Sequence, residues 1–245
     1  MNNDFFENLG EDEKINKTLR KENKREEKPL YIELAGNLGS GVTTCARGLS
    51  KNLNAYLFAT DYYRNMLYEI KNGKQSGFFT NGKSRALYEY LYKKYKDVLD
   101  LNDANAPIYI ENAVKEEAKR KLKSLISARK DIVIDRHMKE GDLFNRVLPL
   151  GYMNIKIYVN SVSKDLNRER VSLKNLDYNK VYDGVVGMNV DYSSKYSSFD
   201  ELYDKNMINS KYYNLFDYII DNNENSLERF QYGIGVVSDH IKSKR

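Results

Sequence analysis

LYIELAGNLGSGVTTCARGLS, residues 30–50, contains the clearest structural signal in the sequence. Its first part, residues 30–35, is a short apolar and β-prone run that stops at glycine, as a buried strand entering a loop does. Beyond the loop, the apolar residues of CARGLSKNL recur at helical spacing, and we expect the pair Thr43 and Thr44 to cap the start of this helix. The stretch therefore predicts a strand, a glycine-rich turn and a helix in direct succession.

The turn GNLGSGVTT, residues 36–44, contains the groups that a phosphate-binding loop requires: glycines, a helix N-terminus and a hydroxyl for magnesium. Against the pattern G-x-x-x-x-G-K-[ST], Gly36 and Gly41 hold the glycine positions and Thr43 holds the hydroxyl, but Val42 stands in place of lysine. That lysine normally neutralises charge on the β- and γ-phosphates. Its absence predicts a lower catalytic rate, or another cation in the same volume. The alternative interpretation is a glycine-rich turn that only packs a strand against a helix.

Four further β-prone runs follow, and helical patterns separate them. They cover residues 55–59, 131–136, 154–161 and 216–222. Strands that alternate with helices indicate crossover connections, so we predict an α/β fold with a five-stranded parallel sheet flanked by helices. Residues 1–28 carry alternating charges and predict a flexible tail or a solvated helix, whereas residues 29–245 are expected to form one domain.

Composition excludes several classes of protein. The single cysteine, Cys45, cannot form an internal disulfide and is expected to be a small buried residue, and two histidines leave little material for a zinc site. The chain lacks an apolar run of about 20 residues and an apolar signal segment, so we expect a cytoplasmic protein without membrane contact. The net charge of +5 is small and dispersed, which disfavours a nucleic-acid partner, although residues 115–130 contain one local basic face.

The motif residues resemble the P-loop nucleoside and nucleoside-monophosphate kinases. YIELAGNLGSGVTT, residues 31–44, is similar to the opening of deoxynucleoside kinases, apart from the lysine. IVIDRH, residues 132–137, resembles their strand that ends in an acidic residue and an arginine. NRERVSLK, residues 167–174, looks like their arginine-bearing lid, and residues 212–230 resemble the end of cytidylate-kinase-like proteins. The resemblance implies a three-layer P-loop kinase fold with an irregular lid at about 168–198, and ATP and Mg²⁺ as cofactors.

Carried over residue by residue, the resemblance assigns the loop to the ATP phosphates, with Thr43 on Mg²⁺. One of the two arginines of residues 168–170 is expected to reach the donor phosphates and to be the best substitute for the lysine. The cofactor-binding residues implied are Gly36, Asn37, Leu38, Gly39, Ser40, Gly41, Val42, Thr43, Thr44, Arg168 and Arg170.

The resemblance also places the acceptor at the carboxyl ends of the strands. Asp61 is expected to be the catalytic base and Asp135 the carboxylate on the magnesium side. Arg136 and Arg64 would bind an acceptor phosphate or orient these carboxylates. Tyr88 or Tyr92 would stack on the acceptor base, and the alternative for these tyrosines is a place in the core or on the helix surface. The alternative for Asp61 is a helix cap.

Three functions remain open on the sequence. The leading hypothesis is ATP-dependent phosphoryl transfer to a nucleoside or nucleoside monophosphate. The first alternative is a weak or inactive pseudokinase that binds a nucleotide or a protein partner, and the second is a kinase that acts on a modified base in DNA. Family resemblance also implies a possible homodimer.

Overall fold

The computed structural model describes residues 27–73, 82–101, 105–135, 148–172 and 199–245. These residues belong to two compact units. One unit joins Lys28–Thr60 to Ala118–Arg245, and the other contains Asp61–Glu117. Almost all of the expected N-terminal tail, most of the expected lid at 168–198, and Arg136 lie outside the described residues.

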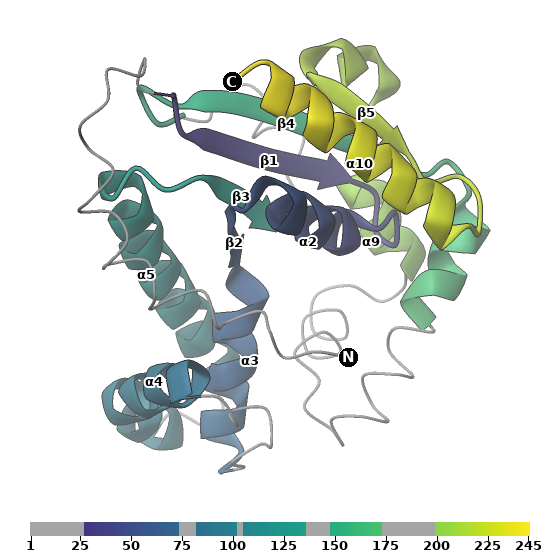
Figure 1. Cartoon of the computed structure of the whole chain (residues 1–245). Helices are drawn as coiled ribbons and strands as arrows, with labels where there is room; N and C mark the ends of the chain where they lie inside the picture. The colour runs from purple at the N-terminus through teal and green to yellow at the C-terminus, as the bar shows by residue number, and fades with distance from the viewer. Residues whose placement is uncertain (1–26, 74–81, 102–104, 136–147, 173–198) are drawn as a thin grey trace, which may run out of the picture. The chain divides into compact units, whose positions relative to one another are not determined.

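The first unit is built on a five-stranded sheet in the order β2-β3-β1-β4-β5 (Figure 1). Every neighbouring pair of strands is parallel. The strands are β1 (Leu30–Gly36), β2 (Tyr56–Ala59), β3 (Ile132–Asp135), β4 (Met153–Asn160) and β5 (Tyr218–Asp221). This arrangement confirms the predicted α/β fold class.

The strand order identifies the edge of the sheet at which a ligand is expected. β3 and β4 flank β1 on opposite sides, so the chain changes direction about β1. In open α/β sheets, ligands bind outside the carboxyl ends of the strands at such a point. At this edge β3 ends in Asp135, and the loops after β1, β4 and β5 begin at Asn37, Ser161 and Asn222.

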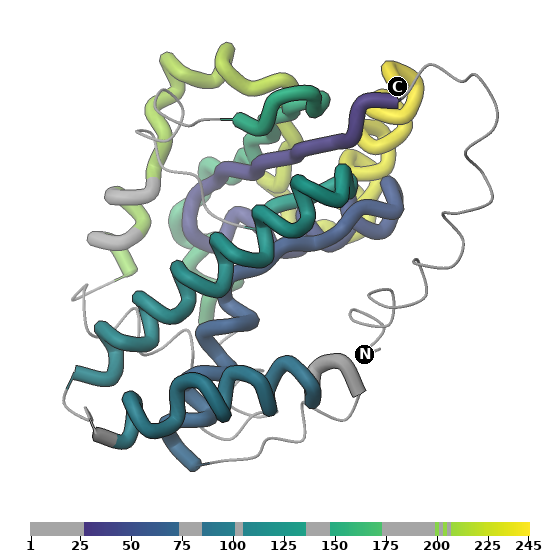
Figure 2. Tube along the Cα trace, turned by 90° about the vertical axis from the view of Figure 1, so that its left-hand side faces the viewer, coloured from purple at the N-terminus to yellow at the C-terminus, as the bar shows by residue number. Residues whose placement is uncertain are grey.

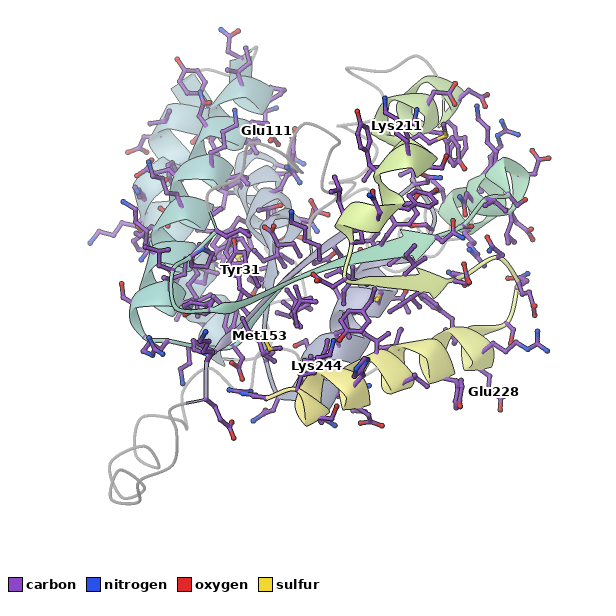
Figure 3. All side chains as sticks on the ribbon, turned by 90° about the horizontal axis from the view of Figure 1, so that it is seen from above. Tyr31, Glu111, Met153, Lys211, Glu228 and Lys244 are labelled. Carbon is purple, nitrogen blue, oxygen red and sulfur yellow. The ribbon has the colours of Figure 1, made fainter. Side chains whose placement is uncertain are left out.

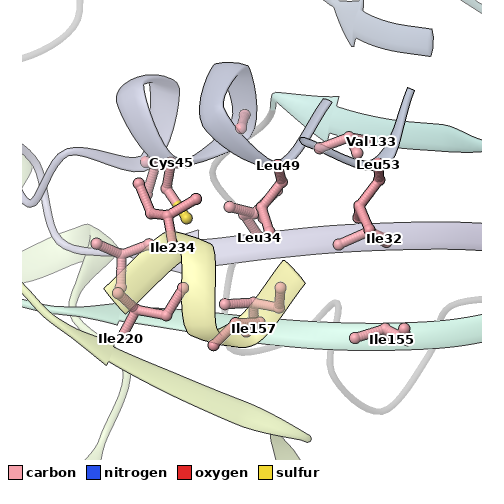
Figure 4. Packing of buried hydrophobic residues seen from close by; sticks show 14 of the residues in the cluster. Ile32, Leu34, Cys45, Leu49, Leu53, Val133, Ile155, Ile157, Ile220 and Ile234 are labelled. Atoms are coloured by element: carbon pink, nitrogen blue, oxygen red, sulfur yellow. The ribbon is translucent and has the colours of Figure 1, made fainter. Parts of the chain in front are cut away.

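One face of the sheet is covered by α2 (Val42–Leu53) and α10 (Leu227–Ser243). Alternate residues of β1 point into this layer, where Leu34 packs among Cys45, Leu49 and Ile234 (Figure 4). Cys45 is fully buried, which confirms the prediction that the single cysteine is a small buried residue. α10 runs along the sheet with Glu228 and Lys244 at opposite ends (Figure 3), and its N-cap is Ser226, whose side chain accepts from the Arg229 N–H.

The opposite face is covered in two places. Residues from Ala118 onward in α5 (Ala106–Ser127) pack on Tyr31, Phe58 and Ile134. Figure 2 shows α5 as one continuous helix, although it belongs to both units. Farther along the sheet, α9 (Phe199–Asn206) leads into the 3₁₀ helix η4 (Ser210–Leu215), which packs beside Tyr158 of β4. Helices on both faces complete three layers.

The second unit contains α3 (Thr60–Lys71), α4 (Gly82–Leu101) and the first part of α5. A buried carboxylate joins α4 to α5: Glu117 accepts hydrogen bonds from Tyr90 at 3.1 Å, Lys94 at 2.8 Å and Tyr95 at 3.0 Å. The bonds to Glu116 and Glu117 raise the pKa of Lys94. The ammonium therefore stays charged and compensates a carboxylate that is fully removed from water.

The start of α2 differs from the sequence prediction. Gly41 is the N-cap, in the left-handed conformation, and makes no side-chain capping bond. Thr43 and Thr44 lie inside the first turn, so the expected threonine cap is wrong. None of the helices that the structure describes is long and apolar enough to span a bilayer.

Candidate phosphate-binding site

The loop between β1 and α2 has the backbone geometry of an anion site. The N–H of Ser40 donates to the carbonyl of Asn37 at 2.9 Å, which closes a turn directly after β1. The first α-helical bond, from the Cys45 N–H to the Gly41 carbonyl, follows at 2.9 Å. Because no side chain caps α2, the N–H groups of its first turn face the loop with the positive end of the helix dipole. A phosphate binds at such a helix end.

Two glycines allow this loop to pack closely against neighbouring residues. Gly39 has φ of +79° and Gly41 has φ of +97°, a region that other residues enter only with strain. A Cβ on Gly39 would lie 2.4 Å from the carbonyl oxygen of Asn167, and one on Gly41 would lie 2.7 Å from Nδ2 of Asn222. Both contacts are too short, so the loop can adopt this path only with glycine at these positions.

Thr43 and Asp135 form the polar pair of the site. The Thr43 hydroxyl, in the first turn of α2, donates to Oδ1 of Asp135 at the end of β3, at 3.1 Å. Hydroxyl and carboxylate oxygens are hard ligands of the kind that Mg²⁺ takes alongside phosphates and water. The structure therefore brings together the two residues that the sequence assigned to the metal.

Ser40 supports the same fit. Its side chain is completely buried, and within the described part of the chain its hydroxyl has no hydrogen-bond partner. A buried polar atom without a partner is destabilising by about 1–3 kcal/mol. A phosphate oxygen held in the loop is an acceptor that would satisfy this hydroxyl.

Val42 is a buried apolar residue at the position where the phosphate-loop pattern has its lysine. It is 1% exposed and belongs to the apolar cluster between α2, α10 and the sheet. The residue that departs from the phosphate-loop pattern is thus a core residue, and it contributes no charge to the loop.

Asn222, the first residue after β5, supports the loop from the opposite side. Its Nδ2 donates to the carbonyl of Ser40 at 2.8 Å. Arg170 in turn donates to the Asn222 carbonyl at 3.0 Å, to its Oδ1 at 3.2 Å and to the carbonyl of Glu224 at 2.8 Å. Burial lowers the pKa of the Arg170 guanidinium. Arg170 therefore supports the loop indirectly, through Asn222, and its guanidinium donates to main-chain and amide oxygens.

Arg168, on the same helical segment of residues 164–172, is engaged elsewhere. It bonds Asp165 at 3.0 Å and Asp200 of α9 at 2.7 Å, and its guanidinium lies 5.3 Å from the centre of the Phe199 ring. The two arginines point to different surroundings, as their spacing predicts. Arg136, the third expected cation, lies outside the described residues.

The expected acceptor residues lie in the other unit. Arg64 forms an ion pair with Asp61 one turn earlier in α3, and it also bonds Glu111 of α5 through Nε at 2.6 Å and Nη2 at 3.2 Å. Tyr88 of α4 is buried and stacks on Tyr92 at 6.0 Å between ring centres. Burial, with the Glu69 charge next, raises the pKa of the Tyr88 hydroxyl.

Sequence reasoning missed the residues that support the loop from behind. They follow other strands or lie on later helices, and they are Ser161, Asn167, Tyr203 and Asn222. The only signal was local: Ser161 and Asn222 are the last residues of two predicted β-prone runs, at the edge where ligands collect.

No family model matches the sequence, and no curated protein matches it. Among solved structures, the chain is similar to shikimate kinase from Acinetobacter baumannii in complex with shikimate, with 18% identity and a TM-score of 0.37, over 89% of this chain and 96% of that chain. It is also similar to TT1252 from Thermus thermophilus, with 16% identity and a TM-score of 0.42, over 87% of this chain and 98% of that one. Both scores are too low to carry a functional inference, so the chain's own geometry must supply it.

Proposed function

We propose that the chain binds MgATP at the loop of residues 36–44 and transfers a phosphoryl group to a nucleoside or nucleoside monophosphate. The observation that carries this proposal is the 3.1 Å bond between Thr43 and Asp135 at the uncapped N-terminus of α2. A hydroxyl and a carboxylate meet there, next to a glycine-rich loop at a helix N-terminus, the arrangement in which backbone N–H groups bind phosphate.

Different residues of the site would bind different parts of MgATP, the phosphoryl donor. Backbone N–H groups of the loop and of the first turn of α2 hold phosphate oxygens, and the Ser40 hydroxyl donates to one of them. Thr43 and Asp135 hold Mg²⁺, which supplies the positive charge that stabilises the transferred group. Because Val42 supplies none, one arginine must carry the remaining charge, and the candidates are Arg136, Arg168 and Arg170. Arg168 or Arg170 would have to leave the partners that it bonds in this structure to do so.

For a nucleoside acceptor, Asp61 is our choice for the base that accepts the hydroxyl proton. Its pairing with Arg64, which Glu111 holds in turn, fixes the carboxylate on the first turn of α3. Arg64 and Arg136 would bind an acceptor phosphate, and Tyr88 would contact the base. A fixed carboxylate is what proton abstraction requires, since geometry limits this step before basicity does.

The test is transfer of labelled phosphate from ATP, with magnesium, to a panel of nucleosides and monophosphates. The wild type is compared with Asp135→Asn and Asp61→Asn, and with Asp239→Asn, an exposed carboxylate of α10, as the charge-matched control. We expect turnover by the wild type and by the control. Asp135→Asn should lose magnesium-dependent nucleotide binding, whereas Asp61→Asn should keep binding and lose turnover. Full activity of both site variants would refute the assignment.

A second function is favoured by one observation, the burial of Val42 in the core. A loop that has packed this position against the sheet fits a pseudokinase that binds nucleotide without turning it over. Nucleotide binding without transfer to any acceptor of the panel would support this alternative, and measurable turnover would exclude it.

A further inference from the structure

A buried set of hydrogen bonds fixes the first residue of the loop. Nδ2 of Asn37 donates to the Tyr203 hydroxyl at 3.0 Å and to the Ser161 carbonyl at 3.4 Å. Oδ1 of the same amide accepts from the Tyr158 hydroxyl at 3.4 Å, which itself accepts from Tyr213 at 3.2 Å. One loop side chain is thus held by β4, by the segment after β4, and by α9.

These groups are buried, so the loss of one of their hydrogen bonds is destabilising. Asn37 is 5% exposed and Tyr203 is 4% exposed. A buried amide that loses its acceptor keeps the full desolvation penalty. Burial, helped by the bond from Tyr213, raises the pKa of Tyr158, so its hydroxyl remains a donor to Asn37 at physiological pH.

Within this set Tyr203 makes the shortest contact to the amide. The Tyr203 oxygen lies 3.0 Å from Nδ2, and the Ser161 carbonyl oxygen lies 3.4 Å from it, so Tyr203 is 0.4 Å closer. Its ring also packs on Leu38, the next residue of the loop. Tyr203 therefore contacts two successive loop residues, one through its hydroxyl and one through its ring.

The orientation of Asn37 sets the path of the loop that follows. Its carbonyl accepts the N–H of Ser40, the bond that closes the turn. α9, which carries Tyr203, is itself joined to the segment 164–172 by the pairs Lys164 with Asp204 at 3.0 Å and Arg168 with Asp200 at 2.7 Å. The loop is consequently connected to the helices on both sides of residues 173–198.

We propose that Tyr203 is a positioning residue for the phosphate-binding loop: its hydroxyl orients Asn37 and thereby sets the geometry with which the loop receives phosphate. The part that concerns nucleotide affinity rests on the function proposed above. The part that concerns loop geometry does not.

The experiment compares wild type, Tyr203→Phe and Tyr152→Phe by calorimetric titration with MgATP. Tyr152 is the matched control, since it is also a buried tyrosine whose hydroxyl makes a hydrogen bond, here donated to the Ile126 carbonyl at 3.2 Å, and it lies away from the loop, just before the start of β4. We expect both variants to lose similar stability towards urea. Only Tyr203→Phe should bind MgATP about five-fold more weakly, equivalent to about 1 kcal/mol at 1.4 kcal/mol per ten-fold. In an Asn37→Ala background, the same substitution should have no further effect on affinity.

Hydrogen exchange of the amides of residues 38–44, measured without nucleotide, separates the two parts of the inference. Faster exchange in Tyr203→Phe than in Tyr152→Phe supports positioning of the loop. If wild type binds no MgATP, the proposed function fails and this exchange alone decides the role of Tyr203. Equal exchange in the two variants, or wild-type affinity in Tyr203→Phe where wild type binds, overturns the proposal.

Discussion

Restoring the missing cation by Val42→Lys should lower stability and raise nucleotide affinity together. Val42 is 1% exposed, so its side chain contributes about 1.5–2 kcal/mol of burial to folding. The lysine stem can retain part of these contacts, but its ammonium must leave the apolar cluster because an isolated buried charge is strongly unfavourable. We expect a loss of about 2 kcal/mol in the absence of ligand.

Bound phosphate opposes this loss of stability. An ammonium on the first residue of α2 can reach the phosphates, and a hydrogen bond to a charged group contributes about 1.5–3 kcal/mol. That is a roughly 10- to 100-fold gain in affinity for MgATP. Val42→Met is the control, since it perturbs the same packing without charge.

Urea denaturation with and without MgATP measures both quantities. Val42→Met should lose stability and gain no affinity. A Val42→Lys variant that is as stable as wild type, and that binds MgATP with unchanged affinity, would refute both the packing of Val42 and the identity of the loop.

Three further predictions concern single groups. Gly39→Ala should abolish nucleotide binding in a folded protein, since its Cβ meets the Asn167 carbonyl at 2.4 Å; calorimetry that finds wild-type affinity would contradict this contact. Lys94→Met should lower the free energy of unfolding, measured in urea, by about 2 kcal/mol. This is less than the loss expected for a fully buried ion pair, because Lys94 is part-exposed. An unchanged urea midpoint would mean that Glu117 is not charged in the folded protein. Burial, and then the Asp135 charge, raises the pKa of Cys45 above its ordinary 9.0, so its contribution to stability is present below pH 9 and is lost as pH rises further. Stability measured from pH 8 to 10 should fall more steeply in wild type than in Cys45→Ala, and parallel curves would rule out this thiol.

Local sequence patterns were sufficient for the fold and for part of the site. Apolar runs bounded by glycine or by polar residues predicted all five strands. The signal was clearest for β1, because a parallel strand buried on both faces reads as a continuous apolar run. The spacing within the loop paired Thr43 with the phosphate site, and the carboxylate at the end of the third run placed Asp135 at the same edge. The 3.1 Å bond between them follows from the parallel register of β1 and β3.

Contacts between distant segments could not be predicted in this way. Tyr203 is 166 positions from Asn37, and Asn222 is 182 positions from Ser40, so no local periodicity links them. The chain has 21 tyrosines, and nothing in its pattern distinguishes Tyr203 from the others. The expected threonine cap failed because Gly41, with its left-handed backbone, already ends the loop.

The most direct test of the phosphate-binding assignment is a calorimetric titration of the folded wild-type chain with MgATP. The geometry of the loop, with Thr43 and Asp135 beside an uncapped helix, predicts saturable binding to a single class of sites that requires magnesium. Absence of binding by a protein with a cooperative unfolding transition would contradict the assignment and leave the glycine-rich turn with a packing role alone.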